Sequence, residues 1–171
     1  ESFLKSAEYP VIIDPTMTVN STGSGSNKSI QDTTVFNFSP YSGQNYGSGS
    51  ISVGMSSPVA AGSRGVAYSF IKFPGMTNKF VFKTLDPSQI TACNMYYREI
   101  GDTSSVSASI RMYMYRGNVW DENTLTYNTA DIEQISASHG TMGIVGGGWY
   151  NFPIPNMAKN WCSGTEDPDK G

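Results

Sequence analysis

The sequence contains few of the side chains that catalytic and metal-binding sites usually need. It has one histidine, His139, and two cysteines, Cys93 and Cys162. Neither cysteine has a second cysteine or a histidine at the spacing of a zinc site, and no Gly-x-Ser-x-Gly elbow occurs. The carboxylates are scattered, without the local pairing that indicates a glycosidase acid and base. We therefore predict a protein that is not an enzyme, with both cysteines buried as small hydrophobic side chains or, alternatively, joined in a disulfide.

Charge is also scarce. Charged residues make up 15% of the chain, the net charge is −3, and no block of Lys or Arg occurs. Without such a block the chain lacks the electrostatic attraction that nucleic acid and anionic membranes require. No apolar run approaches the ~18 residues of a spanning helix, and residues 1–10 lack the layout of a signal peptide. We expect no nucleic-acid partner and no membrane insertion, and we interpret the chain as the interior of a longer protein.

The residues that are abundant are typical of short strands joined by polar turns. Gly occurs 18 times and Tyr 10 times. Runs rich in β-branched and aromatic residues recur between Gly- and Pro-containing turns. They lie at residues 33–38, 51–55, 66–73, 80–82, 92–99, 107–116 and 149–154. This spacing predicts an all-β fold, a two-sheet antiparallel β-sandwich of the jelly-roll type. At most one short helix is expected, near residues 156–161, with Asn156 as its cap.

The first part of the chain differs from the rest. An apolar run, residues 11–13, is enclosed by Pro10 and Pro15, and residues 20–27 consist of Ser, Thr, Gly and Asn. We expect residues 1–29 to be an extended lead-in segment and flexible linker, and residues 30–171 to be the β-sandwich module. Residues 9–14 are predicted to lie along a sheet edge, either in their own sheet or in a neighbouring molecule, which would give an oligomer by strand donation.

Two strands can be divided into faces because successive side chains point to opposite sides of a sheet. In the first, Cys93, Met95 and Tyr97 are predicted to face inward and Asn94, Tyr96 and Arg98 outward. In the second, Ile110, Met112 and Met114 form the inward set, and Arg111, Tyr113 and Tyr115 line the other face.

Taken together, the order of these segments resembles the DNRLRE domain family. The matching pieces are residues 9–15, 32–35, 45–47, 51–54, Arg64 with 68–73, 90–92, 115–116, 120–128, 148–152 and 160–164. The family consists of β-sandwich modules in large secreted and surface proteins of bacteria and some archaea, including polysaccharide-active enzymes and proteins with RHS repeats. The resemblance implies an extracellular or cell-surface location.

The resemblance also assigns structural positions and shows departures. It implies that Trp120 and Trp161 are core residues, and we expect Phe70 and Phe73 with them. The stretch 76–88 is longer than in the family, Tyr127 stands where the family has Trp, and the chain stops at Gly171, where the family continues into a final strand. We expect an open sheet edge there.

Exposed tyrosines are the best candidates for ligand binding. Tyr41 and Tyr46 lie in a Gly/Ser/Asn loop, and Tyr96, Tyr113 and Tyr115 lie on predicted outer faces. Aromatic rings with polar neighbours are suited to stacking on sugar rings and binding hydroxyl groups. One hypothesis is a non-catalytic module that attaches a larger protein to polysaccharide. The other is a structural spacer or assembly module that contacts neighbouring domains of the same parent protein.

No cofactor is predicted, apart from a structural calcium ion as a secondary alternative. Calcium needs several oxygen ligands converging from loops. Asp121, Glu122, Asp131 and Glu133 offer carboxylates in loop-like segments. None of these segments has the regular spacing of a calcium loop, so solvated acidic turns are the preferred interpretation.

Overall fold

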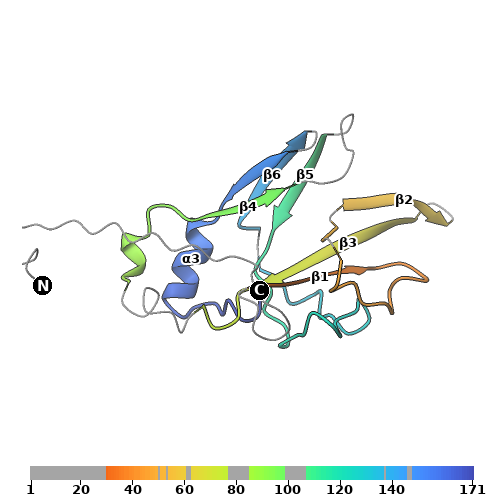
Figure 1. Cartoon of the computed structure of the whole chain (residues 1–171), viewed down its shortest axis with the longest axis horizontal. Helices are drawn as coiled ribbons and strands as arrows, with labels where there is room; N and C mark the ends of the chain where they lie inside the picture. Colours follow the sequence, from red (N-terminus) through yellow and green to blue (C-terminus); the bar gives the residue numbers. More distant parts are fainter. Residues whose placement is uncertain are drawn as a thin grey trace, which may run out of the picture.

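The computed structural model describes residues 30–49, 51–52, 54–60, 63–76, 85–98, 107–136, 138–145 and 148–171. In these ranges the chain is an all-β sandwich of antiparallel strands with one short α-helix (Figure 1), as predicted. The elements are β1 (Gln31–Phe36), β2 (Gly54–Ala60), β3 (Ser63–Lys72), η3 (Pro87–Gln89), β4 (Asn94–Arg98), β5 (Ser107–Met112), β6 (Gly140–Val145), β7 (Trp149–Pro153) and α3 (Pro155–Cys162). None of the described residues belongs to a helix long and apolar enough to cross a membrane.

Several predicted segments lie outside the described residues. They are the lead-in and linker, residues 1–29, which include the proposed strand donor at 9–14, and the predicted strand at 80–82. The strand predicted at 51–55 begins instead at Gly54 and continues to Ala60. Before it, the Ser52 amide donates to the Thr34 hydroxyl at 2.8 Å, so residue 52 pairs with a side chain of β1.

The largest sheet has the order β1-β3-β2 and is antiparallel throughout. β3 is its central strand, and Val35 of β1 lies opposite Tyr68. Thr33, Thr34 and Val35 are all buried, so β1 is covered on both faces in its middle part. Phe70 of β3 directs its ring into one of two hydrophobic clusters.

These two clusters form the core. The first contains Phe73, Met114, Phe152, Met157 and Trp161, among others. The second contains Val35, Phe70, Tyr115, Trp120 and Leu125. The four residues expected in the core, Phe70, Phe73, Trp120 and Trp161, are all buried and are divided equally between the clusters.

The two cysteines are free thiols, and both pack against the first cluster. The Cys162 thiol donates to the Leu85 carbonyl at 2.9 Å. Burial is the first cause that raises the pKa of both thiols. They therefore act as small hydrophobic side chains, the first of the two interpretations offered above.

β4 and β7 form a two-stranded antiparallel pair whose inner side packs on the first cluster. Along β4 exposed and half-buried residues alternate: Met95 and Tyr97 face the core, and Tyr96 faces solvent. The predicted assignment of faces in this strand is confirmed.

In β5 the predicted alternation holds only to residue 114. Met112 packs against the core, Tyr113 is exposed and Met114 is fully buried. Tyr115, predicted on the outer face, is buried with 6% of its surface exposed. This prediction was wrong because Tyr115 lies three residues beyond the end of β5 and packs against Phe70 in the second cluster.

The predicted helix is present as α3, but its cap differs from the prediction. Ile154 is the N-cap residue and makes no side-chain capping bond, and Pro155 occupies the first turn, where the missing N–H of proline costs no intrahelical bond. After the helix, Gly164 adopts a φ of +73°, in the left-handed region that glycine tolerates best. Its amide donates to the Trp161 carbonyl.

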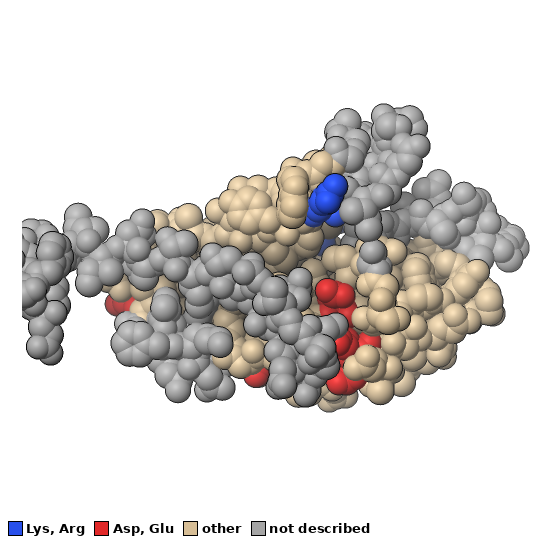
Figure 2. All heavy atoms as spheres, in the orientation of Figure 1, with Lys and Arg blue, Asp and Glu red and all other residues tan. Residues whose placement is uncertain are grey.

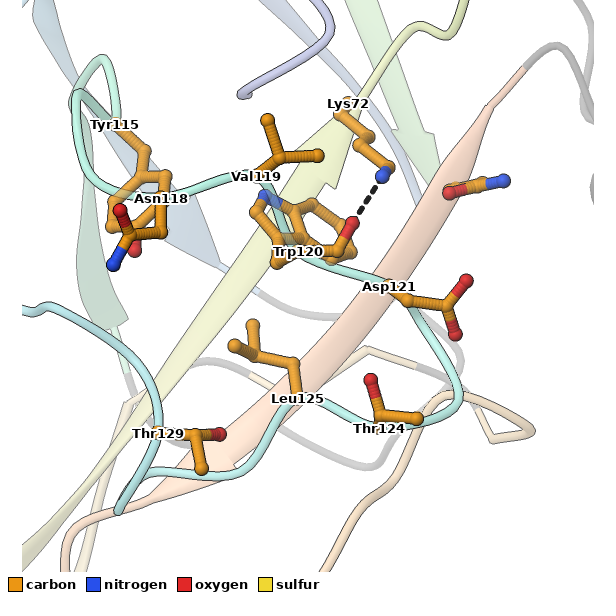
Figure 3. Close-up of a pocket in the computed structure, with 10 residues that line it drawn as sticks. Lys72, Tyr115, Asn118, Val119, Trp120, Asp121, Thr124, Leu125 and Thr129 are labelled. Atoms are coloured by element: carbon orange, nitrogen blue, oxygen red, sulfur yellow. Dashed lines mark hydrogen bonds between the residues drawn. The ribbon is translucent and has the colours of Figure 1, made fainter.

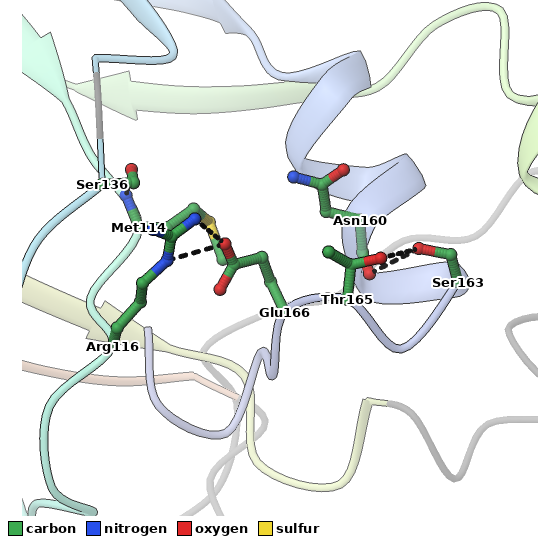
Figure 4. A network of polar contacts seen from close by, with 7 residues as sticks. All are labelled: Met114, Arg116, Ser136, Asn160, Ser163, Thr165 and Glu166. Carbon is green, nitrogen blue, oxygen red and sulfur yellow. Dashed lines mark hydrogen bonds and ion pairs between the residues drawn. The ribbon is translucent and has the colours of Figure 1, made fainter.

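The segment after α3 is bonded back onto the sandwich. Figure 4 shows side-chain contacts of this segment. Arg116 pairs with Glu166, with Nε–Oε1 at 2.9 Å, and the Ser163 and Thr165 hydroxyls are hydrogen-bonded at 2.8 Å. Further on, Phe73 donates its amide to Pro168 and Tyr115 donates its amide to Gly171. Residues 168–171 thus accept backbone hydrogen bonds from two parts of the sandwich.

Candidate functional site

The outward side of the β4–β7 pair presents six exposed residues. They are Asn94, Tyr96 and Arg98 on β4 and Trp149, Asn151 and Pro153 on β7. Asn94 lies opposite Pro153, Tyr96 opposite Asn151, and Arg98 opposite Trp149. Paired residues in antiparallel strands point to the same face, so these six form one surface, called here the β4–β7 outer face.

Two aromatic rings dominate this face. Trp149 has 71% of its surface exposed and Tyr96 has 64%, the two largest values among the described aromatic residues. Because Asn151 lies opposite Tyr96 and two residues after Trp149, the two rings are diagonal neighbours, which places their backbones about 7–8 Å apart. An exposed tryptophan beside an exposed tyrosine is the kind of apolar patch that marks a binding surface.

The core holds the outer face in place from behind. Phe152, between the exposed Asn151 and Pro153, has 1% of its surface exposed, and Met95 and Tyr97 pack on the same cluster. The Tyr97 hydroxyl donates to the Met95 sulfur at 2.6 Å, and burial raises the pKa of Tyr97 well above its ordinary value. The strands are therefore anchored, and the face is formed before any ligand arrives.

The polar groups of the face suit hydroxyl-rich ligands. Arg98 offers up to five N–H donors, and Asn94 and Asn151 each offer an amide donor and an acceptor. The face carries no carboxylate and no histidine, so it has no pair of groups for acid–base chemistry. Its residues are suited to stacking and hydrogen bonding.

The other predicted tyrosines lie elsewhere. Tyr41 and Tyr46 belong to an aromatic cluster with Phe36 and Phe38, in which the Tyr46 ring meets Phe36 edge-on at 4.9 Å. Tyr41 keeps 42% of its surface exposed, whereas Tyr46 is half-buried and donates to the Gln44 side chain at 2.9 Å. Both tyrosine rings pack against Phe36.

Tyr113 and Tyr115 are also separate from the outer face. Tyr113 is exposed and follows the last residue of β5. The buried Tyr115 ring packs edge-on against Phe70 at 5.1 Å, and the Tyr115 hydroxyl accepts a hydrogen bond from the Asp131 amide. Of the five tyrosines, Tyr96 alone belongs to the outer face, and Tyr115 is buried in the second cluster.

Trp149 is the residue that sequence reasoning missed. It begins a predicted strand, but its face was not assigned. The signal was present, because Phe152 and Ile154 are apolar and alternate with Trp149, Asn151 and Pro153. Because successive side chains of a strand point to opposite faces, this alternation puts Trp149 on the face opposite Phe152 and Ile154.

The acidic residues considered for calcium do not converge. Asp121 accepts from the Asn123 amide at 2.8 Å in an exposed turn, and Glu122 is buried. Within the described ranges no three Asp, Glu, His or Cys side chains form a group that could hold a metal ion. On the face seen in Figure 2, Lys and Arg form no basic band over the described surface.

Comparison with models of known protein families gives a match. A family model, that of carbohydrate-binding module family 96, matches residues 25–167. No curated protein and no solved structure matches the chain. The match supports the association with carbohydrate that the DNRLRE resemblance implied, under a different family name.

Proposed function

Since this chain belongs to carbohydrate-binding module family 96, we propose that it is a non-catalytic module that attaches a larger protein to polysaccharide through the β4–β7 outer face. Family membership supports carbohydrate as the ligand class. The outer face is the surface whose residues suit that ligand best.

The observation that carries this proposal is the exposure of Trp149 and Tyr96 as neighbours on paired strands. Apolar faces of sugar rings can cover such side chains and release the water above them. Covering roughly 100 Å² of apolar surface contributes about 2.5 kcal/mol. A Kd of about 1 mM needs about 4.1 kcal/mol, so stacking supplies most of a weak affinity.

Hydrogen bonds supply the remainder and the specificity. Each net hydrogen bond contributes about 0.5–1.5 kcal/mol, and Arg98, Asn94 and Asn151 border the two rings. We expect a single module to bind with a Kd between about 10 μM and 1 mM. A parent protein with several modules would bind more tightly through effective concentration.

The role that fits this affinity is attachment outside the cell. Polysaccharides of cell walls and extracellular matrices are extended and repetitive, and an exposed strand pair with two aromatic rings can bind along such a chain. We infer a secreted or cell-surface location and an adhesive role for the parent protein.

A glycan array followed by calorimetry tests the proposal. The array carries alginate, pectin and bacterial and plant cell-wall polymers, and the proteins are the wild type and the double variant Tyr96→Ala/Trp149→Ala. We expect the wild type to bind at least one polymer and the double variant to bind none. An array on which the wild type binds nothing at millimolar glycan overturns the proposal and favours contacts with protein instead.

A further inference from the structure

A second concave site lies away from the outer face. A cavity of about 570 Å³ opens where β1, β3 and the loop 115–129 meet (Figure 3). Its lining includes Gln31 on β1, Lys72 on β3, and Asn118, Trp120, Thr124 and Thr129 on the loop. We call it the Trp120 pocket. It shares no residue with the β4–β7 outer face.

The floor of the pocket is fixed by the core. Trp120 has 5% of its surface exposed, packs edge-on against Phe70 at 5.8 Å, and donates its indole N–H to the Lys170 carbonyl at 2.6 Å. Figure 3 shows the Lys72 ammonium donating to the Trp120 carbonyl, and the same ammonium lies 4.6 Å from the centre of the indole ring. The pocket is therefore preformed.

One polar atom in the lining has no partner. Gln31 is buried with 6% of its surface exposed, and its Oε1 makes no hydrogen bond within the described part of the chain. A buried acceptor left without a donor is costly, and folded proteins rarely contain one. Gln31 lines the pocket, so a turn of its side-chain amide brings this acceptor to a hydroxyl group bound there.

The charges around the pocket indicate an uncharged ligand. Burial lowers the pKa of Lys72, while Asp121, Asp169 and Glu122 act in the opposite direction. The ammonium already donates to the Trp120 carbonyl and shares the lining with the Asp121 carboxylate, so it offers little to an anion. Asp121, an exposed lining residue, further disfavours negative charge.

The remaining lining matches a small ring with several hydroxyl groups. Asn118, Thr124 and Thr129 are exposed and polar, and Val119 is 74% exposed beside them. We propose that the Trp120 pocket binds an uncharged sugar residue at the end of a glycan chain, as a second site distinct from the outer face. The choice of sugar rests on the proposed function. A concave pocket receives a chain end, whereas the flat outer face receives the middle of a chain.

The three tryptophans of the chain provide a direct assay. Trp120 lies in the pocket, Trp149 on the outer face, and Trp161 in the core with 3% of its surface exposed. In a ¹⁵N-labelled protein each indole N–H gives one NMR signal, assigned with single Trp→Phe variants. Trp161 is the internal control, because neither site includes it.

The probes are D-glucose, D-galactose, D-mannose and N-acetyl-D-glucosamine, each titrated alone, and then a polysaccharide bound in the array. We expect at least one monosaccharide to shift the Trp120 signal saturably and leave Trp161 unmoved. Asn118→Ala and Gln31→Leu should each weaken that binding at least fivefold. Asn156→Ala, an exposed asparagine on α3, should not change it.

The outcomes separate the two sites. A Trp120 signal that no monosaccharide moves overturns the pocket proposal, even where the polysaccharide shifts Trp149. Equal binding by wild type and Gln31→Leu also overturns it. A shift of the Trp120 signal with a monosaccharide supports the pocket proposal. If the polysaccharide then leaves the Trp149 signal unmoved, only the proposal that the outer face binds polysaccharide is contradicted.

Discussion

Trp149 lies directly opposite Arg98 across the antiparallel β4–β7 pair, and both side chains are exposed. This register places the one charged group of the outer face beside its largest ring. A guanidinium at that position can donate two parallel hydrogen bonds to neighbouring oxygens of a sugar bound on the ring.

Replacing Arg98 with lysine should therefore weaken binding, although the charge is kept. The lysine ammonium lacks the planar fork of arginine. We expect Arg98→Lys to lower the affinity for polysaccharide about tenfold, which corresponds to about 1.4 kcal/mol. Calorimetry measures the change, with Arg111→Lys on β5 as the matched exposed control. Full affinity in Arg98→Lys would show that only charge matters at this position.

Replacing an exposed tyrosine should weaken polysaccharide binding only where its ring belongs to the outer face. Tyr96→Ala removes a ring of the outer face, and we expect at least a fivefold loss of affinity. Tyr113→Ala removes an exposed ring that follows β5, and Tyr41→Ala removes one from the loop cluster, so neither should change binding. If Tyr41→Ala or Tyr113→Ala has the larger effect, the binding surface has been assigned to the wrong side of the molecule.

The assignment of Tyr96 followed from local sequence, because a regular strand alternates its faces and the alternation of residues 93–98 was visible. The same rule failed at Tyr115, where the strand had already ended. The partners of Tyr46 could not be predicted either. Its ring is half-buried by Phe36, a contact between a strand and a loop that no local pattern encodes.

The Asn45-Tyr46-Gly47 segment shows another limit. From sequence, Asn45 and Gly47 are only parts of the family resemblance, whereas Tyr46 is also a candidate binding residue. In the structure the Asn45 amide donates to the carbonyls of Glu122 and Leu125, each at 2.8 Å. Glu122 and Leu125 lie 77 and 80 positions after Asn45 in the sequence. Only the folded chain reveals that Asn45 is bonded to both.

Gly47→Ala should destabilise the protein without altering the binding face. A Cβ at residue 47 would overlap the backbone carbonyl of Glu122, so the clamp would have to shift. We expect a cost of about 1–3 kcal/mol and a Tm lower by about 2–12 °C, measured by calorimetry or circular dichroism. Gly43→Ala is the control, because its Cβ would make only an ordinary contact, 3.5 Å from the Asn128 amide. A Gly47→Ala protein as stable as Gly43→Ala would contradict the close approach.

Alkaline pH should unfold the protein partly through Tyr97. Burial holds the pKa of Tyr97 above the ordinary value of 10.0, so the folded state binds this proton more tightly than the unfolded state. The contribution of Tyr97 to the free energy of unfolding is fully present below about pH 10. It is lost as the pH rises toward the pKa of Tyr97 in the folded state, by up to about 1.4 kcal/mol per pH unit.

Tyr97→Phe should flatten this loss, because the variant keeps the ring but cannot ionise. Denaturant melts between pH 9 and pH 11 measure the slope. Tyr96→Phe, on the exposed side of the same strand, is the matched control and should keep the wild-type slope. Identical slopes in the two variants would show that Tyr97 does not control alkaline stability.

The most direct measurement is the affinity of Trp149→Ala and Trp149→Phe for the polysaccharide that the array identifies. Trp149 is 71% exposed, so both variants should keep the wild-type Tm, since surface substitutions usually change stability by less than about 0.5 kcal/mol. We predict that Trp149→Ala loses at least tenfold in affinity and that Trp149→Phe, which retains an aromatic ring, recovers most of it. Wild-type affinity in a folded Trp149→Ala protein would contradict the assignment of the β4–β7 outer face as the carbohydrate-binding site.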